Sequence, residues 1–102
     1  MSLKKQYLKS KPICKVTFRI PEAQGRMAKK AQVLGNFNDW SVDSAPMKRL
    51  KSGAFNLTLD LETGREYEFR YLFDGRIWQN DADADGTVST PFGDGFNSKI
   101  VL

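Results

Sequence analysis

Strict alternation between apolar and polar residues limits what this chain can fold into more than any other feature of its sequence. The pattern runs through residues 14–20, 55–61 and 67–73. A period of two is typical of a β-strand that turns one face to a core and the other to water. In the third segment the apolar face is entirely aromatic. We therefore predict three half-buried strands.

Shorter segments complete the predicted β-structure. We expect further strands at residues 31–34, 47–50 and 96–102, and a short strand that ends at Trp78. Turns separate them, and Asp74-Gly75 is the strongest hairpin signal. Residues 22–28 are polar and irregular, and no segment has a convincing helical period. Short strands with turns about every 8–12 residues predict an all-β fold, an antiparallel β-sandwich of about seven strands.

The length and composition fit one globular domain. The chain has 102 residues, with 40% hydrophobic and 27% charged residues. Cys14 is the only cysteine, which excludes an internal disulfide and favours a reducing compartment. No apolar run approaches the roughly 18 residues of a membrane-spanning helix, and the N-terminal residues lack the apolar segment of a secretory signal. We therefore expect a cytoplasmic protein with no membrane partner.

Positive charge is concentrated near the N-terminus. The net charge is +4, and five lysines lie within the first fifteen residues. We expect residues 1–12 to form a basic arm, whose first ten residues are either mobile or folded into one short helix turn, and residues 13–102 to form the domain. Basic surfaces attract nucleic acid in some proteins. Because such charge is far more often a solvated surface, we do not expect nucleic acid as a partner.

Two tryptophans occupy positions that suit binding better than core packing. Trp40 and Trp78 each follow a predicted strand and stand in a polar turn. Alternation along residues 67–73 places Arg70 on the outer face, close to Trp78. An indole beside a guanidinium suits a sugar, whose C–H face packs on the ring while its hydroxyls bond to charged and amide groups such as Asn97. The alternative is that either tryptophan is buried and plugs an open end of the sandwich.

The residue types needed for catalysis are poorly represented. The chain has no histidine, and no serine or cysteine has a partner that would activate it as a nucleophile. Carboxylates between residues 81 and 94 would reach the spacing of a glycosidase only by chance. A small convex sandwich offers no cleft in which to distort a sugar ring. We therefore expect no enzymatic activity.

One acidic segment resembles the first half of a calcium-binding loop. Residues 81–86, DADADG, place carboxylates at positions one, three and five and a glycine at position six. Position twelve is Phe92, where such a loop needs a glutamate, and no flanking helices are expected. We interpret the segment as a solvated acidic turn and expect no metal or cofactor.

Several motifs together resemble a known family. The motifs are GNFNDW at residues 35–40, APM at 45–47, YEFRYLFDG at 67–75, and shorter matches at 80–81 and 92–98. They resemble family 48 carbohydrate-binding modules. This family includes the glycogen-binding domain of the AMP-activated protein kinase beta subunit, and the early-set domains that precede the catalytic barrels of isoamylases and glycogen branching enzymes. The resemblance covers residues 13–102.

The resemblance implies an immunoglobulin-like early-set β-sandwich that binds α-1,4-linked glucan, such as glycogen, starch or a malto-oligosaccharide. At the positions that match the family's sugar-binding residues, this chain has Trp40, Arg70, Trp78, Phe92 and Asn97. Two departures from the family pattern fall beside this site. One additional residue precedes Trp78, and the loop after Phe92 is longer and lacks the threonine of the kinase-type modules.

Two functional hypotheses follow. The first is non-catalytic binding of α-glucan through an exposed tryptophan platform. The alternative is a protein–protein interaction or regulatory module for a glycogen- or starch-metabolising enzyme, without direct sugar binding. Both are open at this point, because function resides in the site rather than in the fold.

Overall fold

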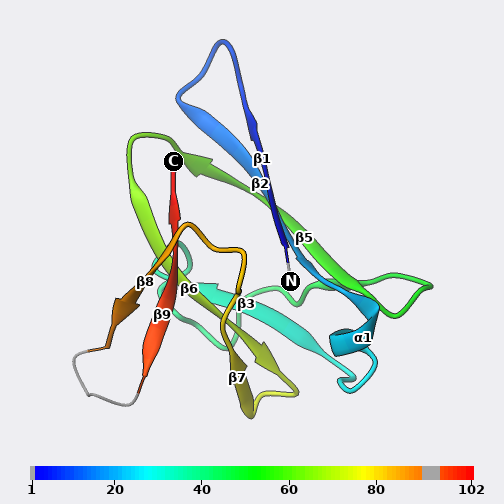
Figure 1. The fold of residues 1–102 in the computed structure, drawn as a ribbon. Helices are drawn as coiled ribbons and strands as arrows, with labels where there is room; N and C mark the ends of the chain where they lie inside the picture. Colours follow the sequence, from blue (N-terminus) through cyan, green and yellow to red (C-terminus); the bar gives the residue numbers. More distant parts are fainter. Residues whose placement is uncertain (1, 91–94) are drawn as a thin grey trace.

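Two antiparallel sheets build the protein (Figure 1). A computed structural model describes residues 2–90 and 95–102, which contain nine strands and one four-residue helix, α1 (Glu22–Gly25). The first sheet has the order β1-β2-β5-β4, with β1 Ser2–Tyr7, β2 Ile13–Ile20, β5 Phe55–Glu62 and β4 Lys48–Arg49. The second sheet has the order β3-β6-β9-β8, with β7 paired to β6; its strands are β3 Ala31–Gly35, β6 Glu66–Phe73, β9 Phe96–Val101, β8 Gly86–Ser89 and β7 Ile77–Gln79. Within the described residues, no helix has the length and apolar character needed to cross a membrane.

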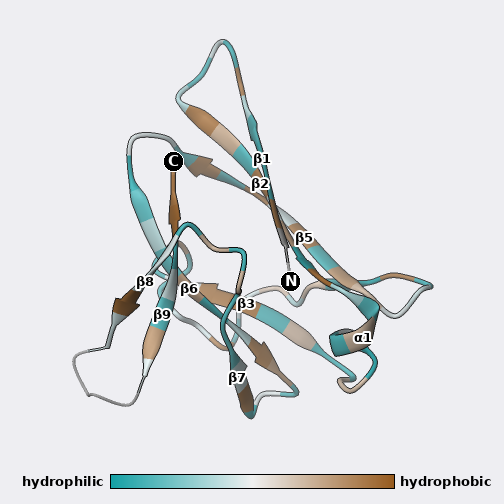
Figure 2. Cartoon of the chain, in the orientation of Figure 1, coloured by the Kyte–Doolittle hydropathy of each residue, from teal (hydrophilic) through white to brown (hydrophobic). Residues whose placement is uncertain are grey.

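The predicted alternation is confirmed, and it builds the core between the two sheets. The even positions of β2 and the odd positions of β6 are buried. Figure 2 shows the alternation as hydrophobic and hydrophilic bands along β2 and β5. At the centre, Phe18 packs edge-on against Phe69 and Tyr71, with ring centroids 5.2 Å and 6.5 Å apart. Each such pair adds about 0.5–1.5 kcal/mol beyond the burial of its area. The expected all-β sandwich is therefore confirmed.

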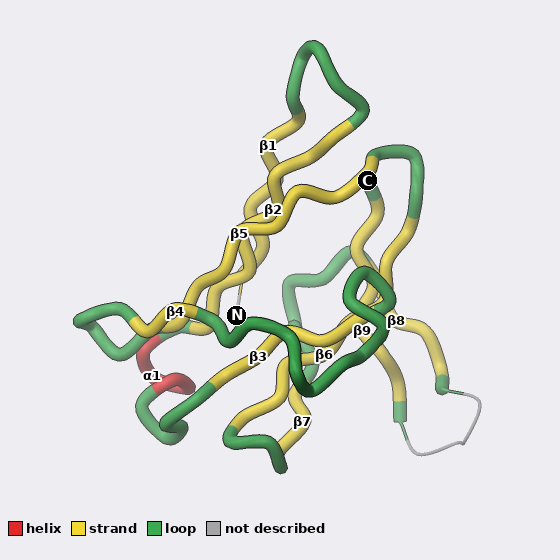
Figure 3. Tube along the Cα trace, turned by 180° about the vertical axis from the view of Figure 1, so that it is seen from behind, coloured by secondary structure: helices red, strands yellow, loops and turns green. Residues whose placement is uncertain are grey.

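Residues 2–7 form β1 instead of the mobile arm or short helix turn expected for the first ten residues. This strand runs antiparallel to β2 at the edge of the first sheet, and the loop between the two strands protrudes beyond the sandwich (Figure 3). Leu3 packs against the core, whereas Lys5 takes an inward position opposite Val16. Because this inward position holds a lysine, residues 2–7 lack the alternation of apolar and polar residues that predicts a strand. The domain boundary at residue 13 stays a prediction.

Lys5 joins this N-terminal strand to the second sheet. Its ammonium group donates hydrogen bonds to Asp85 Oδ2 at 2.7 Å and to the carbonyl oxygen of Val101 at 3.1 Å. The same carboxylate oxygen accepts the Val101 N–H at 2.8 Å. Burial by itself would raise the pKa of Asp85, but these hydrogen bonds and the charges of Lys5 and Lys99 together hold the pKa below its ordinary value. The ion pair therefore favours the folded state at neutral pH.

Replacing Asp85 with asparagine should lower the free energy of unfolding at pH 7 by about 1 kcal/mol, because Lys5 and the Val101 N–H lose a charged acceptor. The folded-state pKa lies below the unfolded value of about 3.9, so this stabilisation is present above about pH 4. It is lost as the pH falls through the folded-state pKa. Urea denaturation at neutral and at acidic pH should therefore show a difference between the two proteins that shrinks in acid.

The exposed ion pair between Lys15 and Asp60, at 3.2 Å, provides the control for this measurement. Asp60→Asn should change the free energy of unfolding by less than about 0.5 kcal/mol. If Asp85→Asn lowers the free energy of unfolding no more than Asp60→Asn does at neutral pH, the contact between Lys5 and Asp85 does not stabilise the fold.

Candidate functional site

The turn after β3 takes its shape from the GNFNDW motif at residues 35–40. A side chain on Gly35 would overlap the carbonyl oxygen of Glu68 in β6 and would come within 2.8 Å of the Phe37 ring. Asn36 continues the pairing with β6 beyond the end of β3. Its N–H donates to the Glu68 carbonyl oxygen at 3.2 Å, and its Oδ1 accepts the Glu68 N–H at 3.1 Å. The start of the motif therefore docks the turn onto β6.

Phe37 and Asn38 attach the turn to the core and to β3. The Phe37 ring lies 5.7 Å from the Phe18 ring in the core. Asn38 closes the end of β3, because its Oδ1 accepts the Gly35 N–H at 3.0 Å and its Nδ2 donates to the Val33 carbonyl oxygen at 3.0 Å. The first four residues of the motif thus act in folding, and each has a structural reason for its identity.

Trp40 ends this turn in a strained backbone conformation. Asp39 and Trp40 both have a φ of 56°, in the left-handed region that bulky residues rarely adopt. The Trp40 N–H donates to the Gly35 carbonyl oxygen at 2.9 Å, which returns the chain to the end of β3. Strain of this kind costs about 1–3 kcal/mol and persists where surrounding contacts enforce it. Trp40 is half-buried, so part of it remains open to solvent.

The outer face of the second sheet carries Arg70 and Trp78. Because Phe69 and Tyr71 face the core, Arg70 and Leu72 point outward. Trp78 lies directly opposite Leu72 in the ladder between β6 and β7, and opposite residues share a face. Trp78 is 45% exposed, whereas Leu72 beside it is 2% exposed. This face therefore presents an exposed indole beside a covered leucine.

The Arg70 guanidinium lies on the same face. Leu34 is opposite Arg70 in β3 and is fully buried. Arg70 Nε is also buried and has no hydrogen-bond partner among residues 2–90 and 95–102, while Nη2 would lie 3.9 Å from a Cβ placed on Gly95. None of the ion pairs between described residues includes Arg70. Its N–H groups are therefore suited to a ligand that covers this face.

Asn97 joins the face from β9. Ser98 lies opposite Phe69 and is buried, so Asn97 points outward. Its Nδ2 donates to Glu68 Oε1 at 3.0 Å. Glu68 precedes Arg70 by two residues and shares its face. The sequence interpretation missed Glu68, although the alternation along β6 already indicates that it points outward.

Three of the predicted site residues, Arg70, Trp78 and Asn97, thus share one outer face. Trp40 lies at the end of the turn that follows β3, and Phe92 lies outside the described residues. Neither tryptophan is buried, and Trp78 stands on the outside of the sheet rather than plugging an end of the sandwich.

The acidic segment at residues 81–86 differs from the expected solvated turn. Asp81 is only 4% exposed. Its Oδ2 accepts a hydrogen bond from the Tyr71 hydroxyl at 2.8 Å, and its Oδ1 accepts the Asp83 N–H at 2.9 Å. Burial first, and then the charge and hydrogen bond of Asp81, raise the pKa of Tyr71 far above its ordinary value. The interpretation as a solvated turn is therefore wrong for Asp81, which is a buried acceptor for the core tyrosine.

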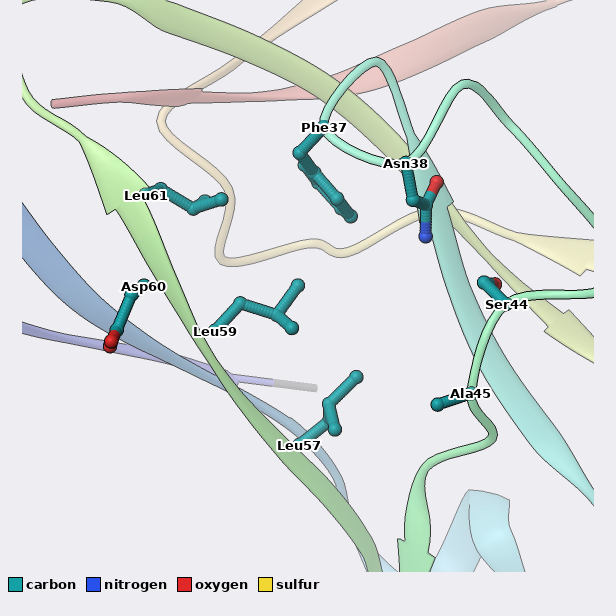
Figure 4. A pocket seen from close by; sticks show the side chains of 8 residues that line it. All are labelled: Phe37, Asn38, Ser44, Ala45, Leu57, Leu59, Asp60 and Leu61. Atoms are coloured by element: carbon teal, nitrogen blue, oxygen red, sulfur yellow. The ribbon is translucent and has the colours of Figure 1, made fainter.

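A groove that the sequence did not predict lies between the turn after β3 and strand β5 (Figure 4). Its volume is about 290 Å³, and it is lined mainly by apolar side chains: Phe37, Asn38, Ser44, Ala45, Leu57, Leu59, Asp60 and Leu61. One edge of β5 pairs with β2 along its full length, whereas on the other edge β4 pairs only with Phe55 and Asn56, so beyond Asn56 no described strand pairs with that second edge. Its aliphatic lining suits apolar side chains better than the hydroxyls of a sugar.

Comparison with known proteins identifies a family for this chain. The model of the family Carbohydrate-binding module 48 (Isoamylase N-terminal domain) matches residues 23–84, which is more than half of the chain. The match includes the turn at Trp40 and the strands that carry Arg70 and Trp78, and it ends before Asn97. No curated protein matches the chain. The matched residues and the two-sheet fold show that this chain belongs to carbohydrate-binding module family 48.

Proposed function

We propose that this protein binds α-1,4-linked glucan, as glycogen, starch or malto-oligosaccharide, and that it catalyses no reaction. The ligand lies on the outer face of the second sheet, in contact with Arg70, Trp78 and Asn97, and Trp40 and Phe92 complete the site. The observation that carries the proposal is the exposure of Trp78 on the same face as Arg70 and Asn97.

The chemistry of this face suits glucose rings. The exposed indole offers an apolar plane to the C–H face of a pyranose. Arg70 donates hydrogen bonds, and the Asn97 amide can both donate and accept them, which matches the dual character of sugar hydroxyls. Because a shallow site leaves much of the sugar in water, we expect dissociation constants on the order of 0.1–1 mM.

The hydrogen bonds of two carboxylates, Glu68 on this face and Asp81 in the interior behind it, support a non-catalytic role. Glu68 accepts a hydrogen bond from Asn97, and Asp81 accepts one from Tyr71 in the core. A glycosidase needs one carboxyl group free to protonate the leaving oxygen and a second that acts as base or nucleophile. Glu68 and Asp81 are instead engaged in contacts that hold the strands together.

Titration with maltoheptaose tests the proposal. Tryptophan fluorescence should change in a saturable manner, because both indoles are at least partly open to solvent. Cellohexaose provides the control, since its β-1,4 linkage gives the glucose chain a different shape, and it should cause no saturable change. No change up to about 10 mM maltoheptaose would contradict the proposal, because even weak specific binding is saturable in that range.

The groove beside β5 favours a second candidate function, a protein-interaction or regulatory module for a glycogen- or starch-metabolising enzyme. An unpaired strand edge next to an aliphatic groove is the arrangement by which many domains add an extended peptide to a sheet. A pull-down with the Trp40→Ala/Trp78→Ala double variant separates the two candidates. Retention of such an enzyme by a variant that no longer binds maltoheptaose would favour the second.

A further inference from the structure

We infer that Glu68 is a positioning residue of the glucan site. Its carboxylate orients the Asn97 amide so that Asn97 Oδ1 faces the ligand as a hydrogen-bond acceptor. The inference rests on the proposed function and deepens it in one respect. It assigns a donor and an acceptor to the hydrogen bond between Asn97 Oδ1 and a sugar hydroxyl. A sugar hydroxyl that meets Asn97 Oδ1 must donate to it.

The position of Glu68 is held from both sides. Toward β3, its N–H and carbonyl oxygen are hydrogen-bonded to Asn36 at 3.1 Å and 3.2 Å. Toward β9, it is paired with Lys99. The Lys99 ammonium group lies 3.7 Å from the Glu66 carboxylate and forms no ion pair with Glu68 in the described part of the chain. The Glu68 carboxylate is therefore directed to Asn97, at 3.0 Å.

The chemistry of a carboxylate then fixes the amide. A carboxylate accepts hydrogen bonds and does not donate them, so Asn97 must turn its NH₂ group toward Glu68. Its Oδ1 is consequently left for the ligand. Arg70, on the same face, can only donate.

The face thus offers a fixed acceptor near fixed donors. Two sugar hydroxyls meet this pattern when one donates to Asn97 and the other accepts from Arg70. An amide that is oriented before the ligand arrives loses less rotational freedom on binding, which strengthens the complex. Glu68 therefore contributes to affinity without touching the sugar.

Exchanging the carboxylate of Glu68 and the amide of Asn97 tests the direction of the hydrogen bond between them. Glu68→Ala removes the acceptor, and Asn97→Asp places two carboxylates against each other, so we expect each to weaken maltoheptaose binding about five- to tenfold. In Glu68→Gln/Asn97→Asp the hydrogen bond re-forms in the opposite sense, and the introduced carboxylate keeps an oxygen for the sugar. We expect this double variant to bind within about threefold of the wild type. Glu68→Gln alone should also retain binding, since its amide oxygen can still accept from Asn97.

Calorimetric titration measures these affinities, and thermal melting of each variant measures its stability. A merely structural role would make affinity follow the melting temperature, and it would not produce recovery in the double variant. The inference is overturned if Glu68→Ala binds like the wild type, or if the double variant binds as weakly as Asn97→Asp. A wild-type protein that binds no maltoheptaose overturns the proposed function together with this inference, whereas wild-type binding with no recovery overturns the inference alone.

Discussion

Replacing Trp78 with alanine should reduce the affinity for maltoheptaose by about tenfold or more, with little change in the free energy of unfolding. Aromatic anchors of this kind dominate binding energies, and truncating one typically costs more than any surrounding contact. Trp78 is 45% exposed on the outer face, so its removal takes the stacking plane from the ligand and little from the core. Isothermal titration with maltoheptaose measures the loss, and urea denaturation checks the stability.

The neighbouring residue Ile77 provides a matched control. Ile77 lies in the same strand and is 54% exposed, but it is opposite Phe73 and therefore points to the other face of the sheet. Ile77→Ala removes a similarly exposed apolar side chain one position away and should leave sugar affinity within about twofold. Equal losses for Ile77→Ala and Trp78→Ala would mean that the strand, rather than the indole face, supports binding.

Replacing Gly35 with alanine should lower the free energy of unfolding by about 3 kcal/mol or more. The added Cβ would overlap the carbonyl oxygen of Glu68, a backbone atom within the central strand β6, and would press on the Phe37 ring. Neither neighbour can move freely, because Glu68 is hydrogen-bonded to Asn36 and Phe37 packs against Phe18. We also expect weaker sugar binding, since this turn carries Trp40. Urea denaturation measures the loss of stability.

Gly86→Ala is the control for crowding. A Cβ on Gly86 would meet the flexible end of the Lys99 side chain at 3.1 Å, and that end can swing away. The expected cost is less than about 1 kcal/mol. Should Gly35→Ala prove as mild as Gly86→Ala, the close approach of β3 and β6 would have no part in defining the turn.

The strands with clean alternation were predictable from the sequence, and others were not. β2, β5 and β6 follow the period of two, and the structure confirms them. β1 escaped prediction because Lys5 occupies an inward position, where its ammonium group reaches Asp85 across the sandwich. Strand β8 and the single turn of α1 were also not predicted. Both are too short for a periodic signal, so contacts distant in sequence decide their conformation.

The burial of the Asp81 carboxylate was likewise not predictable from the local sequence. Composition alone marks residues 81–86 as a solvated turn. The structure places Asp81 against the Tyr71 hydroxyl, ten residues away in the chain, and its N–H donates to the hydroxyl of Ser98. A charged residue is buried only where such partners exist, and partners from other strands leave no local trace in the sequence.

By itself, the sequence determined the β-sandwich and the side of β6 on which Arg70 and Glu68 stand, because the period of two is a local property of each strand. The family motif likewise marked the turn that carries Trp40. Only the tertiary structure decided that β7 pairs with β6 so that Trp78 falls opposite Leu72, and that Asn97 meets Glu68. Both depend on the register between strands, and a shift of one residue would send those side chains to the opposite face.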